Sequence, residues 1–178
     1  MTTASMPKVT IRPAEFPADK EIVSQLFLEY AQSLPIPLDF QGFEEELAKL
    51  PGKYAVENGG AIFLACTTNT LTDQDKELDP HKTTIGVIAL RPFPTTNSIP
   101  TCELKRLYLA PSCRGLGVSK KLMDAVIARA REMSYKEMLL DSLSSMTAAR
   151  RLYEGYGFVE IESYYQSVED AVFYKLVL

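Results

Sequence analysis

The sequence has few of the residues that cross-link small domains or bind metals in them. Among its 178 residues are three cysteines, Cys66, Cys102 and Cys113, and one histidine, His81. The odd count and irregular spacing of the cysteines argue against a disulfide framework. No Cys/His cluster has metal-ligand spacing, so no metal is expected. His81 belongs to the charged segment 73–82, where we expect a solvated loop and no catalytic role.

Positive charge and long hydrophobic runs are also scarce. The net charge is −4 and the sequence pI is about 5.1, which argues against broad nucleic-acid or anionic-membrane binding. The apolar run Ala61–Cys66 is too short to span a bilayer. The first fifteen residues are polar and carry Pro7 and Pro13, unlike a signal peptide. We therefore expect a soluble cytoplasmic protein, and its acidity is compatible with an amine substrate.

The rest of the composition is that of a globular domain. Hydrophobic residues make up 46% and charged residues 24% of the chain. A chain of this length can bury roughly 70% of its unfolded surface. We predict a single domain over residues 1–178, in which residues 1–7 form a flexible tail.

Hydrophobic periodicity predicts alternating strands and helices. Asp19 is a plausible N-cap for a first helix, which Pro35 ends. Further helices are predicted over 43–50, 117–133 and 147–156. The predicted strands cover residues 8–12, 61–67, 84–90, 102–109, 137–141, 158–161 and 173–178. The alternation from Glu103 onward predicts a parallel or mixed sheet with helices packed against it.

A glycine-containing loop stands between a strand and the third helix. It reads Arg114-Gly115-Leu116-Gly117-Val118-Ser119. Backbone N–H groups at a helix start lack internal partners and favour anions, and small residues let a phosphate approach them. Arg114 adds a positive charge. The loop lacks the endings of a P-loop and of the dinucleotide fingerprint. Alone, it indicates either a pyrophosphate site or a plain connecting turn.

This loop resembles the acetyl-CoA signature of the GCN5-related N-acetyltransferase (GNAT) family, Arg/Gln-x-x-Gly-x-Gly/Ala, with Ser119 in the last position. The strand 103–109 resembles the fourth strand of that family, and residues 148–158 resemble its A-x-x-L-Y-x-x-x-G-F helix and strand. Residues 50–55, 64–65 and 89–92 are similar to a bacterial and fungal subgroup without a well-defined substrate. The resemblance extends from about Val9 to the end.

The resemblance implies a fold and a reaction. The fold is an α/β (α+β) GNAT fold: a mixed, mostly antiparallel twisted sheet of six to seven strands, about four flanking helices and a splayed strand pair at the acetyl-CoA site. The implied reaction is direct acetyl transfer from acetyl-CoA to an amine. Such a transfer needs amine deprotonation, donors for the oxyanion and a proton for the departing thiolate.

Two residues match the family's catalytic positions. Glu103 occupies the place of the general base, acting directly or through a water; otherwise it is an exposed strand carboxylate or a partner of Lys105 or Arg106. Tyr153 matches the general acid; otherwise it is a core aromatic at helical spacing. The family often has Asn where Met146 stands, so a coenzyme contact is lost or moves to Ser144 or Ser145.

The remaining expectations concern ligands. The coenzyme side comprises backbone groups of Leu107, Tyr108 and Leu109, the loop Arg114, Gly115, Leu116, Gly117, Val118 and Ser119, and the side chain of Ser144. Tyr164 and Tyr165 either form a wall of the acceptor site or simply pack in the fold.

A small-molecule amine is the favoured acceptor. The alternatives are a protein N-terminus or lysine, and a non-catalytic acyl-CoA-binding module. A homodimer is possible on the resemblance. A covalent route through Cys113 is conceivable but disfavoured, because this thiol belongs to the pyrophosphate region.

Overall fold

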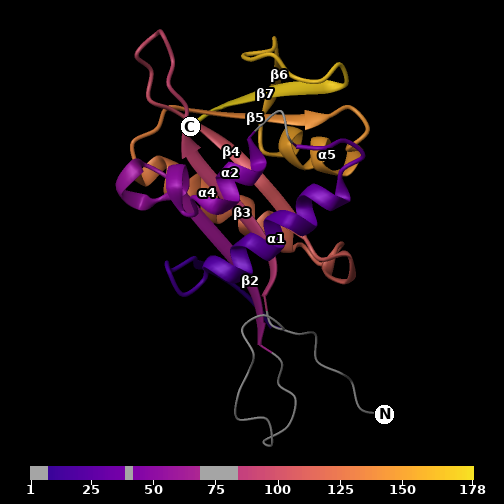
Figure 1. Cartoon of the computed structure of the whole chain (residues 1–178). Coiled ribbons are helices and arrows are strands. Elements are labelled where there is room, and N and C mark those ends of the chain that lie inside the picture. The colour runs from indigo at the N-terminus through magenta and orange to yellow at the C-terminus, as the bar shows by residue number, and fades with distance from the viewer. Residues whose placement is uncertain (1–7, 39–41, 69–83) are drawn as a thin grey trace, which may run out of the picture.

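The computed structural model describes residues 8–38, 42–68 and 84–178, so the predicted tail 1–7 and the charged segment 73–82 with His81 lie outside the described residues. Seven strands of the described part form one sheet in the order β1-β2-β3-β4-β5-β7-β6 (Figure 1). The strands are β1 (Lys8–Pro13), β2 (Ala61–Thr68), β3 (Thr84–Pro92), β4 (Thr101–Leu109), β5 (Glu137–Leu143), β6 (Val159–Ile161) and β7 (Ala171–Val177).

Helices cover both faces of this sheet. Figure 1 places α1 and α2 in front of the sheet and α4 behind it. The described part contains four α-helices and three 3₁₀ turns. They are α1 (Lys20–Ser33), α2 (Phe43–Ala48), α4 (Val118–Glu132), α5 (Thr147–Gly155), η2 (Gly52–Tyr54), η3 (Val56–Asn58) and η4 (Pro111–Cys113).

Strand pairing confirms the predicted mixed, mostly antiparallel sheet. Every neighbouring pair is antiparallel except β4 and β5, which run parallel. Parallel neighbours need a crossover connection, and here α4 provides it between β4 and β5. The family resemblance correctly predicted that most strand pairs are antiparallel, which the alternation of strands and helices did not predict.

The two faces of the sheet carry separate hydrophobic cores. Helix α4 directs Leu122, Met123, Val126 and Ile127 into one core, which also holds Tyr153 of α5. Helix α1 directs four residues with helical spacing into the other core. They are Ile22, Val23, Leu26 and Phe27. Burying each such side chain stabilises the fold by about 1.5–3 kcal/mol.

The start of α1 differs from the prediction. Asp19 stands at the N-cap position, but its side chain makes no capping hydrogen bond. Its carboxylate instead accepts two hydrogen bonds from the Arg12 guanidinium, at 2.6 and 2.8 Å, and one from the N–H of Glu15 at 2.7 Å. Capping is replaced by an ion pair that joins β1 to the helix start.

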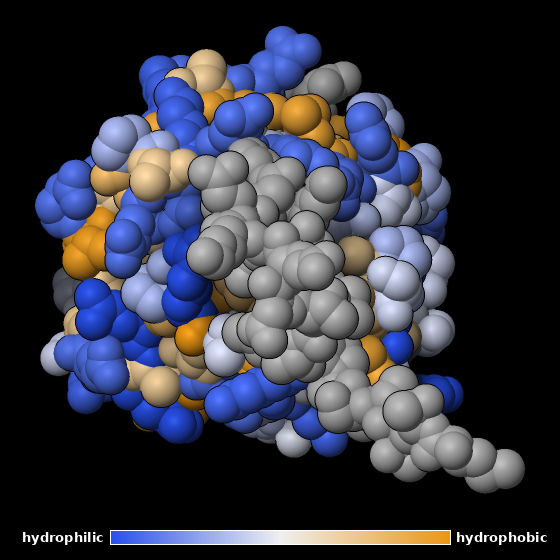
Figure 2. Space-filling view, turned by 90° about the horizontal axis from the view of Figure 1, so that it is seen from below, coloured by the Kyte–Doolittle hydropathy of each residue, from blue (hydrophilic) through white to orange (hydrophobic). Residues whose placement is uncertain are grey.

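The surface mixes polar and small apolar areas. Figure 2 shows one face, on which hydrophilic side chains predominate and apolar ones are scattered. The large apolar side chains that are clearly exposed in the described part are Leu28, Val56, Ile99, Leu116, Val159 and Val177. None of the described helices combines the length and the apolar character that a membrane span requires.

Candidate active site

The candidate site lies where β4 and β5 separate. Only three residue pairs join these strands, the last being Glu103 with Leu139. Beyond that pair β4 continues to Leu109 and β5 to Leu143, but the two strands no longer pair with each other. This is the splayed strand pair that the resemblance implied, and it leaves one edge of β4 open.

A β-bulge shapes the open part of β4. Arg106 and Leu107 together oppose the single residue Ile88 of β3, since Ala89 pairs with Lys105 and Val87 pairs with Tyr108. Arg106 has a φ of 59°, which is rare for a residue with a side chain. Such a bulge bends a strand and redirects its side chains.

The bulge aims Arg106 at helix α2. Its Nε and Nη2 donate to the two carboxylate oxygens of Glu46 at 2.9 and 2.7 Å. The guanidinium also lies over the rings of Tyr30 and Phe43, 5.7 and 5.3 Å from their centroids. Tyr54 donates to the same Glu46 at 2.9 Å. A buried, bidentate ion pair therefore ties α2 to the open strand.

The predicted coenzyme-contacting backbone follows the bulge. Leu107 is half-buried, whereas Tyr108 and Leu109 are buried and pair with Val87 and Gly86 of β3. All three residues lie on β4 beyond its last pairing with β5. An extended ligand arm can therefore approach this stretch as an added strand would.

The glycine loop joins the end of β4 to the start of α4. Gly115 and Gly117 have φ values of 79° and 74°, in the left-handed region that favours glycine. A Cβ built on either glycine meets no protein atom within 4 Å. Arg114, Gly115, Leu116 and Gly117 are exposed. The start of α4 is thus open on its outer side, and binding of a pyrophosphate there stays a prediction.

Other residues of this region have more restricted roles. Val118 is buried in the core, so only its backbone can contact a ligand, and Ser119 is half-buried. The Arg114 Nε donates to the carbonyl oxygen of Leu109 at 3.3 Å, which links the loop to β4. Cys113 is half-buried, with its Sγ 3.6 Å from Ser112 Oγ.

Tyr153 lies on α5 beside the splay. It is buried, and its ring packs against Phe158 and Tyr174 with centroids 5.9 and 6.3 Å apart. It also lines a pocket of about 30 Å³ between the separated strands, together with Leu107 and Asp141. Burial raises the pKa of the Tyr153 phenol above its usual range, so the hydroxyl stays protonated. Core packing and a reactive hydroxyl are therefore compatible at this residue.

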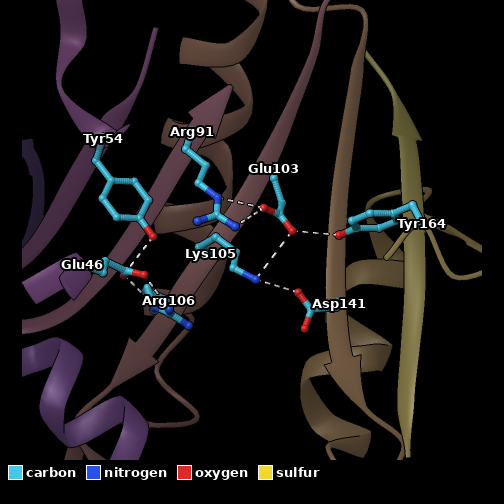
Figure 3. A network of polar contacts seen from close by, with 8 residues as sticks. All are labelled: Glu46, Tyr54, Arg91, Glu103, Lys105, Arg106, Asp141 and Tyr164. Carbon is cyan, nitrogen blue, oxygen red and sulfur yellow. Dashed lines mark hydrogen bonds and ion pairs between the residues drawn. The ribbon is translucent and has the colours of Figure 1, made fainter. Parts of the chain in front are cut away.

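Glu103 is the most enclosed carboxylate of the site. Its side chain is 1% exposed. Oε2 accepts from Arg91 Nε and Nη2 at 2.8 and 2.7 Å. Oε1 accepts from the Tyr164 hydroxyl at 3.0 Å and lies 3.5 Å from Lys105 Nζ. Figure 3 shows Glu103 at the centre of these groups. Of the alternatives drawn from the sequence, the exposed carboxylate is wrong and the Lys105 partnership is confirmed, while Arg106 pairs elsewhere.

Lys105 extends the network to β5. Its Nζ donates to Asp141 Oδ1 at 2.8 Å, and its side chain is only 5% exposed. Figure 3 shows two separate groups of contacts: Glu46 of α2 with Tyr54 and Arg106, and the group around Glu103, which Lys105 extends from β4 to Asp141 of β5. Together their charged members comprise three anions and three cations, which balance each other. They are Glu46, Glu103, Asp141, Arg91, Lys105 and Arg106.

The predicted acceptor-side tyrosines lie next to this network. The Tyr164 ring makes edge contacts with Phe93 and Phe173, at 5.0 and 5.1 Å between centroids. Tyr165 packs against Tyr164 and Phe173. Both tyrosines therefore pack in the fold, and Tyr164 also donates to Glu103. A role of either residue as a wall of the acceptor site stays a prediction.

Ser144 lies at the end of β5 and is exposed, as is Ser145. The Ser144 N–H donates to Asp170 O at 2.9 Å, and its carbonyl accepts from Arg150 at 3.2 Å. Met146, which replaces the family's Asn, lines the pocket beside Tyr153. A coenzyme contact by the Ser144 side chain stays a prediction.

Sequence reasoning missed Asp141, Arg91 and the Glu46–Arg106 pair. One signal was available, because charged residues interrupt otherwise apolar strands at Glu103, Lys105 and Asp141. A charge inside a buried strand needs a partner. No group of three or more potential metal ligands occurs among the residues that the structure describes.

Comparison with known proteins identifies the family. The model of the Acetyltransferase (GNAT) family matches residues 76–158. An uncharacterized N-acetyltransferase of Schizosaccharomyces pombe is 31% identical over 169 residues, which cover 94% of each chain. The chain therefore belongs to the GNAT family, and it is an acyltransferase.

Solved structures agree on the fold. A GNAT-family acetyltransferase of Staphylococcus aureus matches with a TM-score of 0.69 and 22% identity, covering 94% of this chain and 98% of that one. A chain of the NatC complex bound to Gag peptide and CoA matches with a TM-score of 0.69 and 22% identity, covering 96% and 99%. At this identity the two matches establish the GNAT fold alone.

Proposed function

We propose that the protein binds acetyl-CoA along the open edge of β4 and transfers the acetyl group directly to a primary amine of a small molecule. The separation of β4 and β5 carries this proposal. It brings the open backbone of Leu107–Leu109, the exposed glycine loop before α4 and the Tyr153 ring to one region. The loop would hold the pyrophosphate and the strand edge the pantetheine arm.

The transfer needs three contributions from the chain. The amine attacks the thioester carbon, and a backbone N–H of the open strand holds the resulting oxyanion. As the C–S bond breaks, Tyr153 gives its proton to the departing thiolate. Burial raises the pKa of this phenol, so the proton is in place at neutral pH when the C–S bond breaks.

Glu103 acts in this proposal as a positioning residue. Both of its carboxylate oxygens already accept hydrogen bonds, from Arg91 and Tyr164, and its side chain is 1% exposed. Arg91, Tyr164 and the nearby Lys105 ammonium surround the carboxylate and leave an acceptor little room to approach it. We therefore assign it to holding Lys105, Arg91 and Tyr164 in place.

A peptide N-terminus is the second candidate acceptor. The fold similarity to a chain of the NatC complex, which is bound to Gag peptide and CoA, supports it. The pocket beside Tyr153 has a volume of about 30 Å³, so only the amino group of the acceptor fits into it. A small amine and a peptide N-terminus both carry such a group, so the pocket volume does not distinguish them.

Two measurements on the purified protein test the function. Acetyl-CoA should raise the melting temperature, because a ligand that binds only the folded state stabilises it. CoA-thiol release is then followed with a panel of small amines, amino acids and peptides. Thermal stabilisation without release for any acceptor would favour a non-catalytic acyl-CoA-binding module. CoA release with peptides alone would show that the acceptor is a peptide and not a small molecule.

The variant Tyr153→Phe tests the proton donor. We expect turnover to fall by about 10²–10⁴-fold, the usual contribution of general acid–base catalysis, with the acetyl-CoA thermal shift retained. Tyr156→Phe is the matched control on the same turn, since Tyr156 donates to Asp124 and Lys120 at the surface. Equal turnover in the two variants would leave Tyr153 as a core aromatic only.

A further inference from the structure

Two small pockets meet at Asp141. One, of about 30 Å³, lies between the separated strands and is lined by Leu107 and Tyr153. The other, of about 20 Å³, has apolar walls from Leu34, Ile36 and Leu38. Both are also lined by Tyr30, Asp141, Ser142 and Met146. Each has room for one or two waters, and hence for an amino group.

Asp141 and Glu103 differ in their availability to a ligand. Glu103 is 1% exposed and has two ion-pair partners and a phenol donor, and it lines neither of these pockets. Asp141 is 15% exposed, has one ion-pair partner, Lys105 on Oδ1, is in contact with the Tyr165 phenol, and lines both pockets. Asp141 is therefore the carboxylate that an amine beside Tyr153 can reach.

A buried hydroxyl without a partner lies at the same place. Ser142 Oγ has no hydrogen-bond partner among the residues that the structure describes, whereas the Tyr165 hydroxyl contacts Ser167 and Asp141. Ser142 lines both pockets and is 8% exposed, and Ser167 lines the second. Tyr165 lies near enough to Asp141 that the carboxylate, after burial itself, raises the pKa of its phenol. A buried hydroxyl without a partner is uncommon, so a polar ligand group in the pocket would supply the hydrogen bond that Ser142 lacks.

We propose that Asp141, rather than Glu103, is the carboxylate that contacts the acceptor amine and takes its proton. Asp141 accepts a hydrogen bond from the neutral amine and orients the nitrogen lone pair toward the thioester carbon. As the C–N bond forms, the nitrogen gains positive charge and gives one proton to the Asp141 carboxylate. The C–S bond then breaks, and the thiolate takes the Tyr153 proton. Water returns the proton from Asp141 to the phenolate.

The surrounding charges support this assignment. Although burial opposes ionisation, Lys105 holds the pKa of Asp141 below its ordinary value, so the carboxylate is charged at neutral pH. An anion is the form that can accept an amine N–H. The lowered pKa makes Asp141 a weak base, so it takes the proton only as the C–N bond forms and makes the N–H more acidic.

The inference rests on the proposed acetyl transfer, and its test separates the two. Wild type, Asp141→Asn and Glu103→Gln are compared for CoA release with isobutylamine and leucinamide, which have apolar substituents. The acetyl-CoA thermal shift is measured in parallel. Asp124→Asn is the matched control, since this exposed carboxylate on α4 lies outside the site. We expect Asp141→Asn to lower the acceptor kcat/KM by about 100-fold or more. Glu103→Gln should lower it by less than about tenfold, and the thermal shift should persist in all variants.

The outcomes are distinct. Wild-type turnover that survives Asp141→Asn but is lost in Glu103→Gln overturns the inference and leaves the transferase proposal intact. Acetyl-CoA binding without CoA release for any amine in the wild type overturns both. If Asp141→Asn fails to fold, Asp141→Ser, which keeps a small polar group without the charge, is measured in its place. Turnover of that variant at the wild-type level also overturns the assignment.

Discussion

Two neighbouring carboxylates on α2 show how much the setting of a residue determines its effect. Glu46 is 11% exposed and pairs with Arg106, whose side chain is 2% exposed. Glu45 is 70% exposed and pairs with Lys49 one turn away. Removing one partner of a buried pair strands the other charge, whereas an exposed pair contributes little.

We therefore expect Glu46→Ala to destabilise the protein by about 3–5 kcal/mol, because it removes the carboxylate that makes two hydrogen bonds to a buried guanidinium. Glu45→Ala is the matched control on the same helix and should change stability little. Urea unfolding measures both. Equal unfolding midpoints would mean that water replaces Glu46 beside Arg106.

Residue partnerships of this kind could not be predicted from the sequence. The Arg106–Glu46 and Tyr164–Glu103 contacts join residues 60 and 61 positions apart in the chain. Local spacing carries no information about such pairs. Position within a family motif marked Glu103 and Tyr153 as candidate catalytic residues but gave no sign of the contacts around them. Asp19 was predicted to cap a helix, whereas its carboxylate accepts hydrogen bonds from Arg12.

At the scale of elements, the sequence predicted more. The apolar face of 117–133 predicted α4, which spans Val118–Glu132, because helical periodicity is a local property. Strand pairing is not local, so the alternation of strands and helices could not decide between a parallel and a mixed sheet. The bulge at Arg106 had no sequence signal, since its positive φ falls on a residue that rarely adopts it.

The glycine loop gives a prediction at this scale. Gly117→Ala should destabilise the fold by about 1–2 kcal/mol, because alanine is strained in the left-handed region. Its Cβ would project into space free of protein atoms, where we place the pyrophosphate. We expect acetyl-CoA affinity to fall by about tenfold or more if one phosphate contact, worth about 1.4 kcal/mol, is lost.

Gly155→Ala on α5 is the matched control for Gly117→Ala. Its Cβ also meets open space, but its backbone is helical and its φ is not positive. Alanine is favoured over glycine in a helix by roughly 0.5–1 kcal/mol, so stability should rise and acetyl-CoA affinity should stay unchanged. Calorimetric titration and thermal unfolding measure both effects. Retained affinity in Gly117→Ala would argue against a phosphate site at the loop.

At the scale of the whole molecule, buried ion pairs link stability to pH. The hydrogen bonds from Arg12 hold the pKa of Asp19 below its ordinary value, against the opposing effect of burial. The pKa of Asp141 is also lowered, because Lys105 outweighs burial. A carboxyl whose pKa is lower when folded favours the folded state wherever it is ionised. These contributions are fully present above the unfolded pKa of about 3.9 and are lost as the pH falls through the lower folded values.

We therefore expect the urea midpoint to be steady near neutrality and to fall steeply below about pH 4. Asp19→Asn should lower the midpoint at pH 7 and flatten this acid decline, because the variant has already lost the contribution that acid removes. Asp170→Asn, at an exposed position, should keep the wild-type profile. An acid decline of equal steepness in Asp19→Asn and wild type would show that the Arg12–Asp19 pair does not couple folding to pH. The decline would then come from other carboxylates, among them Asp141 beside Lys105.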